Sequence, residues 1–365
     1  MWRVKNSEAL LVSGHSFNKR IRFIDHDGRI GLPWDTFVEV FRNEGFEFLD
    51  SADQASEYEF LISSRHSDAI IRECEMMGID SNRRALIVLE PECVDPIPYL
   101  SRTKEKYGYV HAKSESWATR LDGQSFPSFN GSLSLLDDIG RPDLLEAESR
   151  TNRFVMIQAH KFSVIRGEQY SLRRKVAHEA WREALALDLY GRSWLMSNTE
   201  VLLSVMRSIY NGLSYAIKAR QPSIIQLRGL KKVWFRSGGH YKGEPDDVIE
   251  VLKKYRYALV IENSLDYVSE KLFNAMAAGC RALYIGESLS EYGPSPSSVV
   301  VVKPNPKLIV EAMSKMLDET IIEEFEPLRI RAEARSFFMK GDATRVQRIL
   351  AEKILIQFNR HIAVF

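Results

Sequence analysis

Residues 255–286 read YRYALVIENSLDYVSEKLFNAMAAGCRALYIG, and this stretch constrains the fold more than any other part of the chain. It contains two short apolar runs, 257–261 and 282–285, whose length and composition are typical of buried strands. Between them Ser269 is a suitable N-cap for a helix, and Gly279 is a suitable residue just beyond its end. Strand, loop, helix and strand in this order predict a parallel sheet in an α/β domain.

The junction between the loop and this helix has the properties of a phosphate site. Ligands of parallel sheets bind beyond the carboxyl ends of the strands, where the free N–H groups and positive dipole end of a helix favour an anion. Lys271 places a cation in the first helical turn, which opposes the dipole unless a diphosphate is bound. Glu270 beside it is suited to accept hydrogen bonds from ribose hydroxyls. The alternative is an ordinary surface Glu-Lys pair.

The same stretch resembles the α-1,3-fucosyltransferases (glycosyltransferase family 10), which have the two-domain GT-B fold. Members of that family carry a pattern close to YKF, FENS and DY followed by EKL-x-N-A-x-x-A-G, which is more specific than a lone glycine triplet. The matching positions here are Tyr255, Tyr257, Glu262, Asn263, Ser264, Asp266, Tyr267, Val268, Ser269, Glu270, Lys271, Leu272, Asn274, Ala275, Ala278, Gly279 and Gly286. Two departures, Ala282 for proline and Ile261 for phenylalanine, are apolar replacements at expected packing positions.

A weaker resemblance extends upstream of this motif. Residues 153–157 resemble the first strand of the family's donor domain, 170–176 its Y-x-L-R-x-K helix start, and 184–192 its V-D-x-Y-G strand end. Residues 241–243 resemble the polar segment before the Y-K-F strand. The resemblance implies a bacterial member, since the chain shows no membrane anchor and stem of the Golgi type.

Three arginines are candidates for the diphosphate, because arginine binds such a group through two parallel hydrogen bonds. Arg173 and Arg174 are adjacent, so on a helix they point about 100° apart and normally only one of them faces a ligand. A solvated surface face is the alternative for that pair. Arg192 follows the end of an expected strand.

The donor-binding candidates together come from the motif and from its upstream extension. Glu262 either contacts the donor sugar or orders the loop, and Tyr267 is expected to hold the nucleotide with Glu270. The full set is Arg173, Arg174, Tyr190, Arg192, Glu262, Asn263, Ser264, Tyr267, Ser269, Glu270 and Lys271.

The candidate catalytic base lies in the first half of the chain. Glu90 directly follows the apolar run 85–89 and precedes a proline, so it is expected at the carboxyl end of a strand. An inverting transfer needs a base opposite the leaving diphosphate, and the resemblance implies an acidic residue of the N-terminal domain in that role. The alternatives are a glutamate that only begins a turn, or a base supplied by Glu92 or Asp95.

Length and composition agree with a two-domain globular protein. The chain has 365 residues, which is long for one core, and 45% of them are hydrophobic. A formal net charge of +1 gives no reason to expect nucleic-acid binding. No apolar run approaches the roughly 20 residues that span a bilayer, and residues 1–6 do not read as a signal peptide. Three scattered cysteines indicate thiols in a reducing compartment, and hence a cytoplasmic enzyme; they are Cys74, Cys93 and Cys280.

The N-terminal part also has an α/β pattern. We expect strands at residues 10–12, 46–49, 60–62 and 85–89, and helices at 34–43 and 67–77. The Ser-, Gly- and Pro-rich stretch 114–152 is expected to hold loops and the linker. The predicted organisation is an acceptor-side domain at 1–150, a donor domain at 151–320 and C-terminal helices at 321–365.

No metal-binding motif stands out. Asp25-His26-Asp27 has the spacing of a metal–nucleotide site, but the glycine that follows favours a turn. The histidines show no HExxH or Cys/His spacing, so we expect no metal, with Lys271 and an arginine neutralising the diphosphate instead.

The C-terminal stretch from about residue 317 has a helical period with an apolar stripe. The stripe consists of Phe337, Phe338, Val346, Ile349, Leu350, Ile354, Leu355 and Phe358. Core packing, with a last helix that returns to the first domain, is the expected use. Contact with a membrane surface is the alternative, which would suit a lipid-linked acceptor at the inner face of the membrane.

The sequence therefore predicts an α/β protein of the GT-B type, with two Rossmann-like domains facing across a cleft. The implied reaction is inverting transfer of fucose from GDP-fucose to a hydroxyl of a glycan acceptor in a surface polysaccharide. Two alternatives stay open. One is the same fold with another nucleotide sugar, and the other is a catalytically silent protein that binds a nucleotide sugar.

Overall fold

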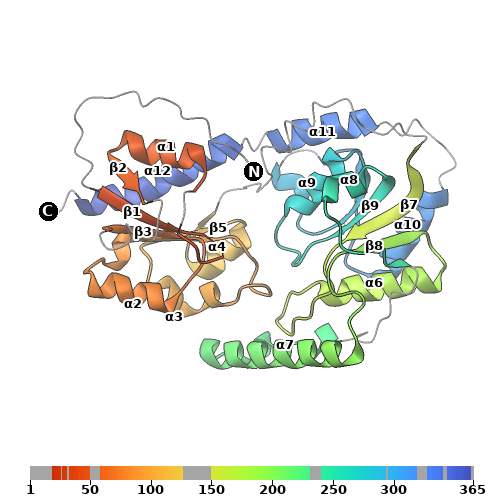
Figure 1. Cartoon of the computed structure of the whole chain (residues 1–365), viewed down its shortest axis with the longest axis horizontal. Coiled ribbons are helices and arrows are strands. Elements are labelled where there is room, and N and C mark those ends of the chain that lie inside the picture. The colour runs from red at the N-terminus through yellow and green to blue at the C-terminus, as the bar shows by residue number, and fades with distance from the viewer. Residues whose placement is uncertain are drawn as a thin grey trace. The chain divides into compact units, whose positions relative to one another are not determined.

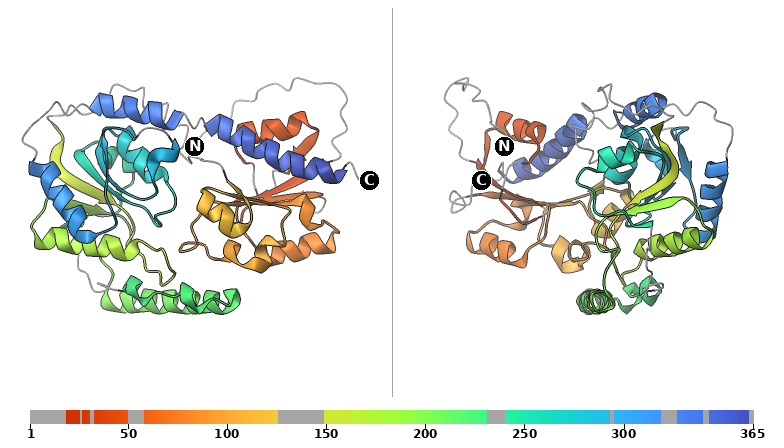
Figure 2. Two further views of the ribbon diagram at one scale, coloured as in Figure 1. Left: turned by 180° about the vertical axis from the view of Figure 1, so that it is seen from behind. Right: turned by 45° about the vertical axis from the view of Figure 1, so that its right-hand side comes forward.

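The computed structural model describes residues 19–25, 27–30, 33–49, 58–125, 149–230, 240–292, 295–318, 327–339 and 343–362. These residues contain two sheets, and every strand pairing described in them is parallel (Figure 1, Figure 2). By their contacts the chain divides into two compact units. One comprises Met1–Ile87, Lys106–Tyr109 and Gln347–Phe365, and the other comprises Val88–Glu105 and Val110–Val346.

The first sheet has the strand order β2-β1-β3-β4-β5-β6. Its strands are β1 (Lys19–Ile24), β2 (Phe46–Phe48), β3 (Phe60–Ser63), β4 (Arg84–Val88), β5 (Tyr109–Ala112) and β6 (Gln124–Ser125). The helices along this part of the chain are α1 (Asp35–Asn43), α2 (Asp68–Met76), α3 (Ser101–Lys104) and α4 (Glu115–Leu121).

A cluster of phenylalanine rings joins the last helix, α12 (Ala343–Ile362), to the first unit. The ring of Phe358 lies 4.7 Å from that of Phe60 on β3 and 6.2 Å from that of Phe41 on α1, measured between centroids. Five members of the C-terminal stripe are buried, as expected for core packing, and two are half-buried. The buried ones are Phe337, Leu350, Ile354, Leu355 and Phe358, and the half-buried ones are Val346 and Ile349. Close aromatic packing of this kind adds to the stabilisation that comes from buried area.

The second sheet has the strand order β11-β10-β9-β7-β8. Its strands are β7 (Thr151–Ile157), β8 (Leu187–Tyr190), β9 (Tyr255–Ile261), β10 (Arg281–Ile285) and β11 (Val299–Val301). The helices along it are α6 (Tyr170–Arg182), α7 (Asn198–Ala219), α8 (Val248–Leu252), α9 (Glu270–Ala277), α10 (Pro306–Asp318) and α11 (Pro327–Met339).

Both faces of the second sheet are covered by helices (Figure 1). Side chains on strand β9 alternate between the two cores: Leu259 packs towards α6 and α10, whereas Val260 packs towards α8, α9 and α11. The strand is therefore apolar at almost every position, as expected for a central parallel strand buried on two sides. This three-layer arrangement holds the carboxyl ends of the strands in fixed positions.

Most of the elements expected from the sequence are present. The structure confirms both strands and the helix in 255–286, the strand at 153–157, and the expected strands and helices between residues 34 and 89. Ser269 caps α9, and Gly279 has the positive φ of 78° that favours glycine beyond a helix end. The turn at Asp25 is confirmed by a hydrogen bond from the Gly28 amide to the Asp25 carbonyl.

The first half of the chain differs in part from the elements expected from its sequence. The stretch that begins at Ser114 is not only loop, because Ser114 caps α4 and β6 follows it. Strand β1 was not predicted, and the strand expected at 10–12 lies outside the described residues. Residues 126–148 of the expected loop and linker stretch also lie outside them, and the domain limits at residues 150 and 320 stay a prediction.

Candidate active site

The topology of the second sheet identifies where a ligand can bind. From β7 the chain passes through α6 to β8 on one side, and from β9 it passes through α9 to β10 on the other. Connections that leave two neighbouring strands in opposite directions open a crevice at the carboxyl ends of those strands. The crevice between β7 and β9 is therefore the expected ligand site of this unit.

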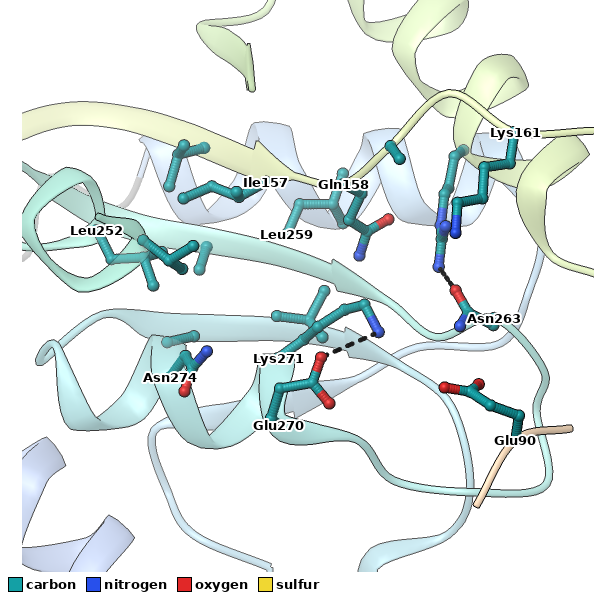
Figure 3. Close-up of a pocket in the computed structure, with 17 residues that line it drawn as sticks. Glu90, Ile157, Gln158, Lys161, Leu252, Leu259, Asn263, Glu270, Lys271 and Asn274 are labelled. Carbon is teal, nitrogen blue, oxygen red and sulfur yellow. Dashed lines mark hydrogen bonds and ion pairs between the residues drawn. The ribbon is translucent and has the colours of Figure 1, made fainter. Parts of the chain in front are cut away.

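A pocket of about 330 Å³ lies at this point (Figure 3). Its volume is within the range of small-molecule sites, about 300–1,000 Å³. All of its lining residues belong to the second compact unit. They are Glu90, Val155, Ile157, Gln158, Ala159, Lys161, Arg173, Val248, Leu252, Ala258, Leu259, Val260, Asn263, Glu270, Lys271, Asn274 and Ala275.

The pocket is apolar at one end and charged at the other. Leu252 and Ile157 lie at the apolar end, and Lys161, Lys271 and Glu90 lie towards the charged end (Figure 3). The cations come from three separate elements, because Lys161 follows β7, Arg173 belongs to α6 and Lys271 lies in the first turn of α9. Convergence of three cations on the N-terminal end of a helix suits a di-anionic or tri-anionic group.

Lys271 is held in place by the buried Glu262 carboxylate. The Lys271 Nζ donates to Glu262 Oε2 at 3.3 Å and to Ser269 Oγ at 2.9 Å. Glu262 is fully buried and also accepts from the Ser269 amide at 2.9 Å and from the Ser269 hydroxyl at 2.6 Å. The carboxylate therefore fixes the start of α9 and the direction of Lys271, which is the loop-ordering role expected as one of its two alternatives.

Arg173 is buried and joins α6 to the loop after β9. Its guanidinium donates to the Ile261 carbonyl at 2.7 and 3.2 Å and to Asn263 Oδ1 at 2.8 Å. Burial lowers the pKa of this arginine from its ordinary value. Because the same guanidinium lines the pocket, Arg173 both orders the loop and presents positive charge to a ligand.

Arg174 points elsewhere. Its guanidinium lies over the ring of Phe162, 4.6 Å from the centroid, and donates to the Lys161 carbonyl at 2.6 Å. Burial lowers its pKa to about 10. Arg174 thus supports the loop that carries Lys161 and does not line the pocket, so the expectation that only one of the two adjacent arginines faces the ligand region agrees with the structure.

Glu90 follows β4 by two residues and presents its carboxyl group to the charged end of the pocket (Figure 3). Glu90 is exposed, but the protein packed around its carboxyl group raises the pKa of that group by desolvation. The positive charges of Lys113 and Lys271 act in the opposite direction. Burial in turn lowers the pKa of Lys113, while Glu90 raises it.

The two other acidic candidates are less well placed. Glu92 is buried, accepts from the Tyr215 hydroxyl at 2.5 Å and forms an ion pair with Arg120. Asp95 lies in the turn after Pro91, to whose carbonyl its amide donates at 3.0 Å. Neither residue lines the pocket, so Glu90 is the acidic residue of the first half that the structure places there.

Several sequence candidates do not line the pocket. The Tyr190 hydroxyl is 3.2 Å from that of Tyr255. Arg192 is exposed and pairs with Glu244. Tyr267 is buried with its ring centroid 5.2 Å from that of Trp117, and Ser264 donates to Asp266.

Three polar pocket residues were not among the candidate site residues, namely Gln158, Lys161 and Asn274. Gln158 Nε2 donates to the Ile261 carbonyl at 2.8 Å, while its Oε1 is buried and accepts no hydrogen bond from the described residues. Asn274 Oδ1 is likewise buried without a donor among them. Helical spacing could have found Asn274, which lies one turn after Glu270, and the end of a strand could have marked Gln158.

Within the described residues no three His, Cys, Asp or Glu side chains converge in a way that could hold a metal ion. The expectation of a metal-independent reaction therefore rests on the charged side chains and stays a prediction. Among the described helices, none has both the length and the apolar character needed to cross a bilayer.

Comparison with known proteins supports the fold. No family model matches the chain. The structure of Anabaena Alr3699/HepE in complex with UDP and glucose aligns with a TM-score of 0.51 at 10% identity, over 93% of this chain and 99% of that one. This likeness, together with two parallel sheets in α/β units, confirms a GT-B fold.

Two further structures are similar at a lower level. A glycosyltransferase from Rickettsia africae ESF-5 aligns with a TM-score of 0.47 at 9% identity, over 93% of this chain and 99% of that one. An α1,3-fucosyltransferase aligns with a TM-score of 0.45 at 10% identity, over 96% and 92%. Likeness at this level adds nothing to the choice of donor.

Proposed function

We propose that this protein transfers a glycosyl group from a nucleoside diphosphate sugar to a hydroxyl group of a glycan. The observation that carries the proposal is the pocket at the carboxyl ends of β7 and β9, where Lys161, Arg173 and Lys271 converge and Glu90 faces them. A diphosphate would complement the positive charge of Lys161 and Arg173 and would share Lys271 with Glu262. The GT-B fold is consistent with this reaction, although fold alone does not define one.

The polarity of the pocket gives the donor a direction. The apolar end around Leu252 and Ile157 suits the face of a nucleobase, and the charged end suits the diphosphate. Glu270 and Asn274 lie one turn apart on α9, so both can accept hydrogen bonds from ribose hydroxyls. In this orientation the sugar projects towards Glu90, which is where a base is needed.

The reaction then follows from these groups. Glu90 takes the proton of the acceptor hydroxyl as its oxygen attacks the anomeric carbon of the donor. The bond from that carbon to the diphosphate oxygen breaks through an oxocarbenium-like state, and its electron pair stays on the diphosphate. Lys271, Lys161 and Arg173 stabilise the charge that develops there. Attack from the face opposite the leaving group inverts the anomeric centre.

GDP-fucose is the donor that we propose, on the strength of the motif at residues 255–279. The phosphate and ribose contacts do not by themselves distinguish one base or hexose from another. A UDP-sugar is therefore the competing donor, and binding without transfer is the competing function. A glycan of the cell surface, attached to a lipid in the simplest case, is the proposed acceptor, and the cytoplasm is the proposed location.

Calorimetric titration of the purified chain with GDP, UDP and GDP-fucose, with and without EDTA, tests the donor. We expect binding of GDP and GDP-fucose that EDTA does not change, and weaker binding of UDP. Preference for UDP would keep the site and discard the fucose assignment. A Glu90→Gln variant that binds the donor as well as the wild type but no longer releases GDP in the presence of acceptor would distinguish transfer from silent binding.

A further inference from the structure

Helix α7 presents a row of large apolar side chains to solvent, here called the α7 stripe. Its members are between 49% and 77% exposed, although the helix is well formed and begins with a capping box at Ser197 and Glu200. They are Leu202, Leu203, Met206, Tyr210, Leu213 and Ile217. A contiguous apolar patch of this size is rare on monomeric proteins, which seldom expose more than a few hundred Å² in one place.

The opposite face of α7 anchors the helix to its own unit. Val201, Gly212, Tyr215 and Ala216 are buried, and Gly212 lies so close to Val164 that a Cβ atom would collide with it. Because this face of α7 is packed against its own unit, the α7 stripe on the other face points to solvent. The proposed glycosyl transfer does not use it, because none of its residues lines the pocket.

The spacing of the stripe is that of a helix that packs along another helix. Leu203, Met206, Tyr210, Leu213 and Ile217 recur at alternating intervals of three and four residues. This is the a/d pattern by which two helices interdigitate their side chains. It favours another helix as the partner over a flat surface.

The stripe is also complementary to itself. Leu203 and Ile217 are each seven residues from Tyr210, and both are apolar and exposed. In an antiparallel pair centred on Tyr210, each of these residues meets its counterpart from a second copy, and the helix dipoles oppose favourably. Such self-complementarity is what a two-fold symmetric interface requires.

We propose that the α7 stripe is the interface of a homodimer in which α7 of two copies pack antiparallel about Tyr210. Two such stripes bury on the order of 1,000 Å² in total, at the lower end of specific interfaces. The dimer should therefore be concentration-dependent in the micromolar range. The three cysteines of the chain are buried, so they do not interfere with a cross-linking test of this arrangement.

Sedimentation velocity of the full chain from about 1 to 100 μM tests the dimer, with an expected mass of twice 41.9 kDa. Leu203→Glu and Ile217→Glu should each raise the dissociation constant at least about tenfold, because they bury a charge. Met76→Glu changes a side chain that is 82% exposed on α2 and should leave the dimer intact. Unchanged thermal unfolding shows that each variant folds.

Cross-linking tests the register. Tyr210→Cys should form a disulfide-linked dimer under mild oxidation, whereas Asn211→Cys, which is exposed about 100° further round the helix, should not. A wild type that stays monomeric across the range would overturn the proposal. So would a dimer that survives Leu203→Glu, or equal cross-linking by the two cysteine variants. None of these outcomes depends on whether the protein binds a nucleotide sugar.

Discussion

The Nζ of Lys271 lies 3.3 Å from Oε2 of Glu262, a carboxylate with no exposed surface. The lysine is itself only partly covered and lines the pocket. One ion pair thus joins the interior of the second compact unit to the surface of the pocket. A ligand phosphate would share the lysine with Glu262, so the pair stabilises the fold in the free protein and binds the ligand in the complex.

Lys271→Met should affect both binding and stability. Loss of a hydrogen bond to a charged ligand group weakens GDP binding by about 1.5–3 kcal/mol. The free energy of unfolding should fall as well, because Glu262 keeps its two contacts to Ser269 but loses its ion pair with Lys271. Calorimetry and urea unfolding measure the two effects. Unchanged GDP affinity in a folded variant would remove Lys271 from the donor site.

Lys161→Met is the matched comparison. The Lys161 side chain is exposed and faces the charged end of the pocket (Figure 3), so its removal should leave the urea midpoint unchanged. GDP binding should nevertheless weaken about tenfold, because a phosphate contact is lost. If GDP binding is unchanged while Lys271→Met weakens it, the diphosphate contacts α9 and not Lys161, and the proposed role of Lys161 is wrong.

The core of the fold could be predicted because local and tertiary requirements agree there. In 255–286 the apolar strands, the cap at Ser269 and the glycine at 279 all indicate the same strand–helix–strand unit, and the structure contains it. Strand β1 was missed although its sequence, KRIRFI, alternates basic and apolar residues in the pattern of a half-buried strand. Helix α7 was missed because its exposed apolar stripe blurs the helical contrast between a buried and a solvated face.

Arg192→Ala tests a candidate that the structure places away from the pocket. The side chain is 79% exposed and its partner Glu244 is also exposed, so solvent screens the ion pair and it contributes little to stability. We expect GDP affinity within about twofold of the wild type and little change in the urea midpoint. A loss of affinity comparable to that of Lys271→Met would show that the loop after β8 reaches the donor.

The sequence predicts a pocket residue only where its type and its position at the end of a helix or strand are enough to place it. Glu270 and Lys271 follow from the helix start, and Glu90 follows from a strand end. Whether Arg173 or Arg174 faces the pocket depends on how α6 is rotated against the sheet, which the sequence does not specify. Lys161 lies in a loop whose path is fixed by the Arg174 contact to its carbonyl, so only the structure shows that it joins the other cations.

His160 should make stability depend on pH. Its ring is stacked on Trp194 with centroids 4.9 Å apart, Nδ1 is 2.9 Å from the Ser193 carbonyl, and burial followed by the charge of Arg174 lowers its pKa to about 4. Between pH 6.5 and 4 the unfolded chain therefore binds a proton that the folded chain does not. Stability is complete above pH 6.5 and falls by up to about 3 kcal/mol as the pH drops to 4.

Urea unfolding of the wild type and of His160→Phe across this range checks the effect. The aromatic replacement keeps the stacking on Trp194 but removes the titrating group, so the slope of stability against pH should become shallower. Equal slopes in the two proteins would mean that His160 is not the group responsible.

The ionisation of Glu90 should determine the acidic limb of the pH–rate profile of glycosyl transfer. A base must be deprotonated to act, and desolvation raises the pKa of Glu90 above that of an ordinary glutamate, so kcat/KM should fall at a higher pH than exposed carboxylates titrate. Glu90→Gln should lower kcat by about 10²–10⁴-fold and leave GDP affinity unchanged. A variant with full transfer activity would exclude Glu90 as the base.

Lys113→Met provides a second readout of the same carboxyl group. Lys113 lowers the pKa of Glu90, so removing its charge should move the acidic limb to higher pH without changing which residue accepts the proton. Because Lys113 is buried against the ring of Tyr267, with Nζ 5.7 Å from the centroid, an apolar side chain of similar length keeps that packing. A limb that moves in Lys113→Met and vanishes in Glu90→Gln would assign it to Glu90. A limb that stays in place in both variants would assign the proton transfer to another group.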